Sequence, residues 1–202
     1  MKDEADRVAD AVAQLAQAFP ATLDRRGPVP LADYFAETTL DHIELPNLTR
    51  GVVSEYLRRE SILAEDLGNP ADPLAGFIFA AGRVGWAFVS TADSLARRRF
   101  TAAHELGHFL LHRRTMGWFR VDTEVTLQEA GEEVADRMER EANRFAAALL
   151  MPEEVCRARA EELRLRYGCC PRGILVYRLA SELLVSREAL RYRLHSLGVG
   201  DE

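Results

Sequence analysis

The segment HELGH at residues 104–108 constrains the fold of this chain more than any other stretch. It lies within the apolar run 100–111, and residues four apart on an α-helix lie above one another on the same face. The spacing therefore predicts a core helix that carries His104 and His108 on one side. A buried imidazole needs a partner for both ring nitrogens, and apolar neighbours supply none.

A divalent metal ion, with an acceptor behind each ring, would supply those partners. Two histidines at this spacing with a glutamate after the first form the zinc-protease pattern, in which the glutamate activates the metal-bound water. The sequence thus predicts a Zn²⁺ site with His104 and His108 as ligands and Glu105 as the catalytic base. The alternative is that two polar imidazoles flank a core helix by chance.

A catalytic zinc site generally takes three protein ligands, so a third donor is needed. His112 continues the same helix face, but it follows His104 by about 12 Å of helix rise, which one ion cannot bridge. We therefore expect His112 to contact backbone or an acid at the helix end. The spacing also departs from the metzincin pattern, which needs a further histidine after a glycine turn.

The third ligand is expected in the segment 138–152. Its apolar stripe comprises Met138, Ala142, Phe145, Ala146, Leu149 and Leu150. At about 100° per residue, Glu139 falls on the margin of this stripe above Asn143, whereas Glu141 points farther toward solvent. Glu139 is the predicted ligand and Glu141 the reserve. The alternative for either is a solvated salt bridge to Arg140 or Arg144.

The segment RFTAAHELGHFLLH at 99–112, followed by 139–152, resembles the ImmA/IrrE family of bacterial metallopeptidases over roughly residues 31–152. The resemblance implies a gluzincin-type zinc endopeptidase with His104, His108 and Glu139 as ligands and Glu105 as base. It also implies cleavage of a cognate helix-turn-helix repressor, which releases stress, mobile-element or phage-defence genes. Many members have asparagine at the end of the strand before the motif, where this chain has Ser90.

We expect an α+β fold with a mostly helical, zincin-like core and a small, about three-stranded antiparallel sheet. Helices are predicted at 4–19, 31–36, 47–59, 93–112 and 134–150, with more helix from 153 to 198 around a break at 168–173. A short strand is predicted at 42–45 and a hairpin at 74–80 and 84–90. Residues 113–136 are expected to form an exposed acidic connection. The predicted domains are 1–152, the peptidase, and 153–202, a helical subdomain resembling a helix-turn-helix.

Charge and cysteine content limit the remaining classes. The net charge of -6 argues against a protein that coats nucleic acid. No run approaches the roughly 18 apolar residues that a membrane span needs, and the acidic N-terminus is unlike a secretory signal. Cys156, Cys169 and Cys170 form no even disulfide framework, which favours a cytoplasmic location. One of these thiols could also occupy the open zinc position and silence an enzyme.

Two basic features leave other functions open. Arg97, Arg98 and Arg99, with 113 and 114 nearby, could bind single-stranded DNA as an activator, or could simply be the basic ends of a helix. Residues 179–194 read as a helix-turn-helix with exposed arginines at 187, 191 and 193, which by itself would indicate a DNA-binding regulator. A pseudopeptidase that binds without cutting is a further alternative, against which the intact Glu105 speaks.

Substrate contacts are less strongly predicted. The strand 84–90 could present an open edge to an extended peptide, or could be an ordinary core strand. The connection 113–136 could act as a lid, although charged loops are usually just solvated. The oxyanion donor is expected among the five tyrosines, which are Tyr34, Tyr56, Tyr167, Tyr177 and Tyr192.

Overall fold

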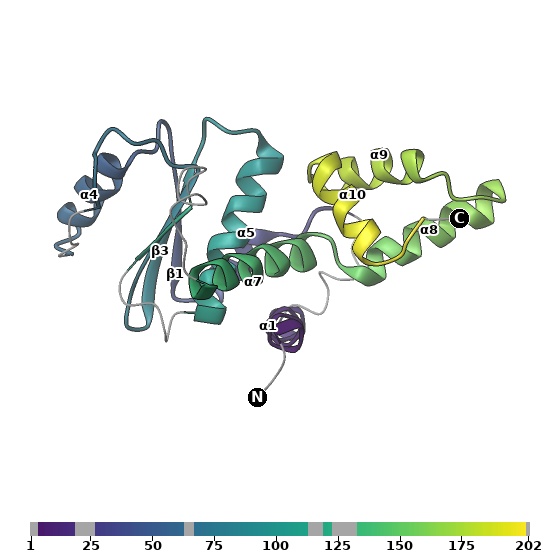
Figure 1. The fold of residues 1–202 in the computed structure, drawn as a ribbon, viewed down its shortest axis with the longest axis horizontal. Helices are drawn as coiled ribbons and strands as arrows, with labels where there is room; N and C mark the ends of the chain where they lie inside the picture. The colour runs from purple at the N-terminus through teal and green to yellow at the C-terminus, as the bar shows by residue number, and fades with distance from the viewer. Residues whose placement is uncertain (1–3, 19–26, 63–66, 113–118, 123–132, 201–202) are drawn as a thin grey trace.

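The computed structural model describes residues 4–18, 27–62, 67–112, 119–122 and 133–200. These residues form an α+β fold, as predicted (Figure 1). In chain order the elements are α1 (Glu4–Ala18), α3 (Leu31–Ala36), β1 (Leu40–Leu45), α4 (Arg50–Arg59), β2 (Gly76–Ala81), β3 (Val84–Ser90), α5 (Leu95–His112), β4 (Phe119–Asp122), α7 (Glu133–Leu150), α8 (Glu153–Tyr167), α9 (Arg172–Leu183) and α10 (Arg187–Ser196).

Local capping signals explain most of these boundaries. The Thr49 side chain accepts a hydrogen bond from the Val52 amide at the start of α4, and Ser186 accepts one from Ala189 at the start of α10. Each cap satisfies a backbone donor that the first helical turn leaves without a partner. Gly168 ends α8 in the left-handed conformation at φ 71°, which favours glycine because it has no Cβ. The predicted break at 168–173 is confirmed, because α8 ends at Tyr167 and α9 begins at Arg172.

The sheet has the strand order β1-β3-β2-β4 within the described residues. The predicted hairpin is confirmed, since β2 and β3 pair antiparallel with Phe77 opposite Phe88. The all-antiparallel, three-stranded arrangement is not, because β1 pairs parallel with β3 and β4 adds a fourth strand beside β2. The suggestion that β3 offers an open edge is wrong, because β3 is hydrogen-bonded on both sides.

Helices cover both faces of the sheet (Figure 1). Side chains of β2 alternate, with Ile78 in the larger apolar core toward α5 and Phe77 and Phe79 in a smaller core. Val53 and Leu57 of α4 close that smaller core. Strands buried on both faces read as nearly continuous apolar runs, which is why β2 and β3 are so apolar in sequence. The face of the sheet that carries Ile78 packs against α5.

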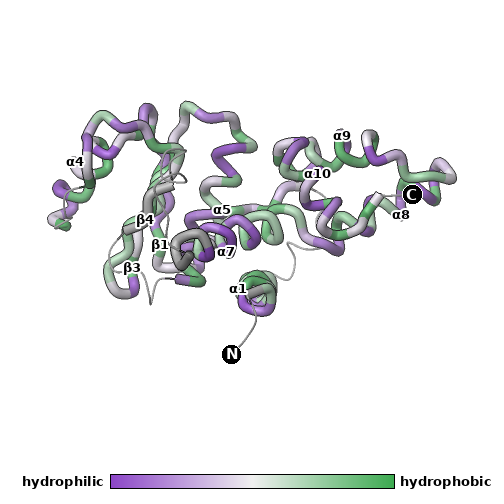
Figure 2. Tube along the Cα trace, in the orientation of Figure 1, coloured by the Kyte–Doolittle hydropathy of each residue, from purple (hydrophilic) through white to green (hydrophobic). Residues whose placement is uncertain are grey.

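The helix α7 crosses α5, and α1 packs against α7 (Figure 1). Hydrophilic and hydrophobic residues alternate along both α1 and α7, as they do in helices that are buried on one side (Figure 2). The predicted exposed connection 113–136 is partly structured, because it contains β4 and the first turn of α7. Its residues 113–118 and 123–132, and with them the suggested lid, lie outside the described part of the chain.

The last three helices, α8, α9 and α10, form one end of the molecule (Figure 1). Their apolar residues, including Leu175 and Leu194, belong to the same core as Phe145 of α7. Arg193 donates to the Met151 carbonyl at 3.1 Å, which ties α10 to the end of α7. The division into 1–152 and 153–202 stays a prediction. No helix in the described ranges combines the length and apolarity needed to cross a bilayer.

Candidate metal centre

The α5 helix places both motif histidines in the core. His104 is 3% exposed and His108 is fully buried. Their rings meet edge to face with centroids 4.5 Å apart, and their Nε2 atoms are 2.9 Å apart. The spacing of one helical turn therefore places the two Nε2 atoms side by side on one face of α5, as the sequence predicted.

Glu139 of α7 joins these two nitrogens. Its Oε2 lies 3.2 Å from His104 Nε2, and its Oε1 lies 3.4 Å from His108 Nε2. Ligand atoms about 2.0–2.2 Å from a tetrahedral zinc ion are about 3.3–3.6 Å from one another. The carboxylate–imidazole distances fit that spacing, and the two imidazole nitrogens are somewhat closer. His104, His108 and Glu139 together are called the donor group, and their ligand atoms all lie within 4.8 Å.

Close packing of α5 against α7 makes this meeting possible. Gly107 lies directly against Phe145, where an added Cβ would be 2.9 Å from Phe145 Cδ1 and 3.2 Å from its Cβ. Ala103 of α5 and Ala142 and Ala146 of α7 are fully buried. Small residues let two helix axes approach, and a glutamate at the margin of the α7 stripe then reaches across to α5. The glycine inside the motif is thus a packing residue.

Asn143 is a site residue that sequence reasoning did not select. Its Oδ1 lies 3.0 Å from His104 Nδ1. An amide oxygen only accepts, so Nδ1 carries the proton and Nε2 presents its lone pair to the donor group. Metal-binding histidines are commonly oriented in this way by an acceptor behind the ring. The available signal was the position of Asn143, one helical turn after Glu139 on the same face.

The electrostatics favour the protonation states that a metal ion requires. Burial lowers the pKa of His108 to about 3, despite the opposing effect of Glu139. Burial raises the pKa of Glu139, but the contacts with His104 and His108 outweigh it and hold that pKa well below its usual range. His108 is therefore neutral and the Glu139 carboxylate is ionised at neutral pH. Converging lone pairs and a negative charge suit a cation between them.

Glu105 lies next to the donor group on α5 and is fully buried. It faces Gly76 at the start of β2, where an added Cβ would be 2.6 Å from Glu105 Oε1 and would also collide with Thr101. The absence of a side chain at position 76 therefore makes room for this carboxylate. This role of Gly76 is a second feature that the linear pattern did not reveal, because strand β2 is brought to α5 only by the fold.

Glu141, the reserve ligand, has a different place. It was expected to point toward solvent, but this is wrong, because its side chain is only 2% exposed. It contacts His112 Nε2 at 3.5 Å, accepts from Arg137 Nε at 3.2 Å and pairs with Arg7 of α1. His112 therefore contacts an acid at the end of α5, as predicted. Glu141 joins three helices through this cluster.

The arginines before the motif are held by separate partners. Arg97 pairs with Asp93 at 3.4 Å, Arg98 pairs with Glu44, and Arg99 donates to the Val29 carbonyl at 2.8 Å. Arg97 is exposed, whereas the other two are half-buried. The remaining two arginines of the suggested patch lie at 113 and 114, outside the described residues. Of the suggested patch, the described residues therefore offer one exposed arginine, Arg97.

The cysteines and most tyrosines lie in other parts of the fold. No cysteine sulfur belongs to the donor group, although all three cysteines are described. Cys156 is buried in α8, and burial raises the pKa of its thiol to about 11. Tyr34 is buried and Tyr56 packs edge-on against Phe88. The exposed tyrosines are Tyr167, Tyr177 and Tyr192, one on each of α8, α9 and α10.

A motif helix with two histidines, a glutamate beside the first and a carboxylate from a second helix is the arrangement of gluzincin-type metallopeptidases. In agreement, residues 62–195 match the model of a peptidase family described as the IrrE N-terminal-like domain. This match covers more than half of the chain, which therefore belongs to that family of metallopeptidases, as the motifs predicted. It continues past residue 152 into α10. No curated protein matches the chain.

Proposed function

We propose that this protein is a zinc-dependent endopeptidase that cleaves a helix-turn-helix transcriptional repressor. The observation that carries the proposal is the donor group of two buried imidazoles and one carboxylate, with the buried Glu105 beside it. Family membership supports a metallopeptidase-type activity. Zinc is proposed because two nitrogens and one carboxylate oxygen, with a position left for water, are its usual catalytic ligands.

In this proposal each residue has a distinct task. His104, His108 and Glu139 hold the ion, and Asn143 keeps His104 in the tautomer whose Nε2 faces the donor group. When bound, zinc supplies Lewis acidity and acidifies the attacking water. The Glu105 carboxylate takes the proton from that water and returns it to the amine of the leaving peptide. Gly76 keeps the space in which this carboxylate lies.

An extended substrate is proposed to bind along β4. Among the described residues β4 is an outer strand, and Asp122 of β4 pairs with Gly76, the residue that faces Glu105. A peptide that adds to the outer side of β4 would therefore run past the end of the sheet nearest to Glu105. Main-chain hydrogen bonds between strands form with many different side chains on the added peptide, so this mode of binding suits a protein substrate.

Cleavage of a repressor would release the genes that it silences, in stress, mobile-element or phage-defence programmes. The enzyme would meet such a repressor in the cytoplasm. Single-stranded DNA is the proposed activating signal. We propose that the DNA contacts Arg97 and the arginines at 113 and 114. This contact is inferred from the sequence, because Arg97 is the one exposed arginine of this set among the described residues.

The deciding experiment incubates the zinc-loaded protein with the repressor encoded beside its gene and follows the products by mass spectrometry. Glu105→Gln is the matched control, because it keeps the donor group and removes only the base. Cleavage by wild type and none by Glu105→Gln, with equal zinc content, is expected. Binding of the repressor without any cleavage by wild type would identify a pseudopeptidase and refute the proposal.

A DNA-binding regulator is the second candidate, favoured by the α9–α10 unit. Leu184 to Ser186 form the turn, and Arg187 and Arg191 of α10 are exposed. The predicted exposure of Arg193 is wrong, because this half-buried side chain is bound to Met151. Duplex binding that is lost on Arg191→Gln, together with repression that persists after zinc removal, would favour the regulator over the peptidase.

A further inference from the structure

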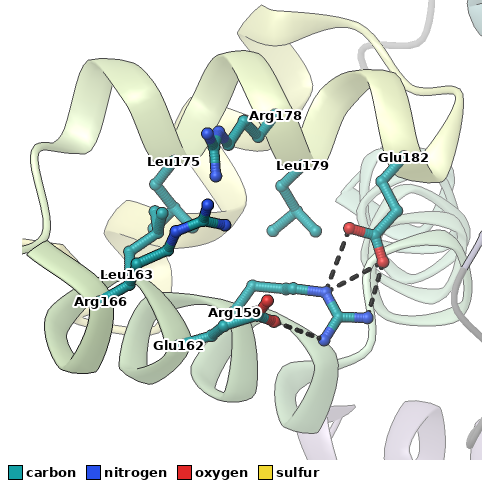
Figure 3. Close-up of a pocket in the computed structure, with 8 residues that line it drawn as sticks. All are labelled: Arg159, Glu162, Leu163, Arg166, Leu175, Arg178, Leu179 and Glu182. Carbon is teal, nitrogen blue, oxygen red and sulfur yellow. Dashed lines mark hydrogen bonds and ion pairs between the residues drawn. The ribbon is translucent and has the colours of Figure 1, made fainter.

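A second polar site lies between α8 and α9, in the C-terminal helical part of the chain. Figure 3 shows this pocket, which has a volume of about 130 Å³. Leu163, Leu175 and Leu179 form its apolar floor, and the remaining lining residues are charged: Arg159, Glu162, Arg166, Arg178 and Glu182. None of these residues belongs to the donor group, and the peptidase proposal assigns them no role.

The two carboxylates of the pocket are both bound to one arginine. Arg159 donates to Glu182 from Nε at 3.0 Å and from Nη2 at 2.7 Å, and to Glu162 from Nη1 at 3.2 Å. Glu162 precedes Arg166 by four residues, and Glu182 follows Arg178 by four. These are the helix positions from which each acid would ordinarily pair with its own neighbour. Arg159 draws both acids to one end of the pocket instead.

As a result, Arg166 and Arg178 remain without carboxylate partners among the described residues. Their guanidinium groups extend toward one another across the pocket from two different helices (Figure 3). Both also lie near the Tyr167 ring, at 5.4 and 5.7 Å from its centroid, and Arg178 donates to the Tyr167 hydroxyl at 3.3 Å. That hydroxyl accepts from Arg178, so its own proton is available to an acceptor.

We propose that this pocket binds the phosphate group of a small phosphomonoester. Two guanidinium groups that face each other repel, and a dianion between them removes the repulsion and can accept bidentate hydrogen bonds from each. The Tyr167 hydroxyl is placed to add a further donor. Because the proposal concerns α8 and α9 only, it goes beyond the peptidase function and stands or falls separately.

The size and floor of the pocket define the ligand further. The pocket volume of about 130 Å³ leaves room for a phosphate group with a few carbon atoms. The three leucines favour carbon in contact with the floor. Free inorganic phosphate shares the recognising chemistry and would bind more weakly, because it lacks the apolar part.

The test titrates the isotope-labelled full-length protein with inorganic phosphate, glycerol phosphate, glycerol and a single-stranded oligonucleotide, and follows amide chemical shifts. Shifts confined to α8 and α9 are expected with the first two ligands, stronger with glycerol phosphate. Glycerol should have no effect. Arg166→Gln and Arg178→Gln should each weaken binding by about tenfold or more.

Arg164→Gln is the matched control. Arg164 lies on the same helix and pairs with Glu161 at 3.7 Å, so its neutralisation changes the charge equally without touching the pocket. It should leave glycerol phosphate binding within about twofold of wild type. Equal weakening by all three variants would indicate diffuse electrostatic attraction and overturn the proposal. So would the absence of shifts, or tighter binding of the oligonucleotide than of glycerol phosphate.

Discussion

Two glutamates that are two residues apart on α7 should respond to the same substitution in opposite ways. Glu139→Gln removes the anionic ligand of the donor group, whereas Glu141→Gln removes the carboxylate that joins α1, α5 and α7. We expect the first variant to lose bound zinc and keep its fold. The second should keep its zinc and lose stability.

The size of the second effect follows from the contacts of Glu141. Its side chain is 2% exposed, and its partners Arg7 and Arg137 are 36% and 52% exposed. A hydrogen bond to a buried charge contributes about 1.5–3 kcal/mol, and partial exposure of the arginines reduces this to about 1 kcal/mol each. Glu141→Gln should therefore cost about 2 kcal/mol. For a chain of this length that corresponds to a decrease in Tm of about 4–8 °C.

The assay is thermal unfolding with a chelator present, so that bound metal does not contribute, combined with zinc analysis of each variant without chelator. Glu139→Gln should melt within about 2 °C of wild type in the chelator and contain little zinc. Loss of zinc from Glu141→Gln with an unchanged Tm would refute the assignment, because Glu141 would then be the ligand and Glu139 a surface residue.

Three further predictions concern the surroundings of the site. Gly76→Ala should push the Glu105 carboxylate out of place and reduce cleavage by about 100-fold at unchanged zinc content, and loss of zinc instead would contradict this role. Asn143→Ala should weaken zinc affinity about 10- to 100-fold in a competition titration with a chelator, and an unchanged affinity would mean that the imidazole needs no orienting partner. Burial raises the pKa of the Cys156 thiol to about 11, which disfavours the reactive thiolate. At about pH 8 a thiol reagent should therefore label the exposed Cys169 before Cys156. Rapid labelling of Cys156 would contradict this and show that α8 opens.

The sequence by itself determined the features that depend on neighbours within one or two helical turns. The position of His104 and His108 on one helix face follows from helix geometry, and the caps at Thr49 and Ser186 follow from local hydrogen bonding. The hairpin of β2 and β3 likewise joins adjacent segments. The resemblance of the two motifs to a known peptidase family was confirmed by the family match.

The tertiary structure alone decided which distant groups meet. Helix periodicity placed Glu139 only at the margin of the apolar stripe of α7. The same periodicity predicted an exposed Glu141, which is wrong. The Glu141 carboxylate is buried because Arg7 of α1 and His112 of α5 contact it, and a helical pattern within α7 does not reveal these partners. The open edge expected at β3 disappeared because β1 pairs with it from a distant part of the chain. Gly76 reaches Glu105 by the same kind of contact. These contacts depend on how separate helices and strands pack against one another. The spacing of residues within one helix or strand carries no information about that packing.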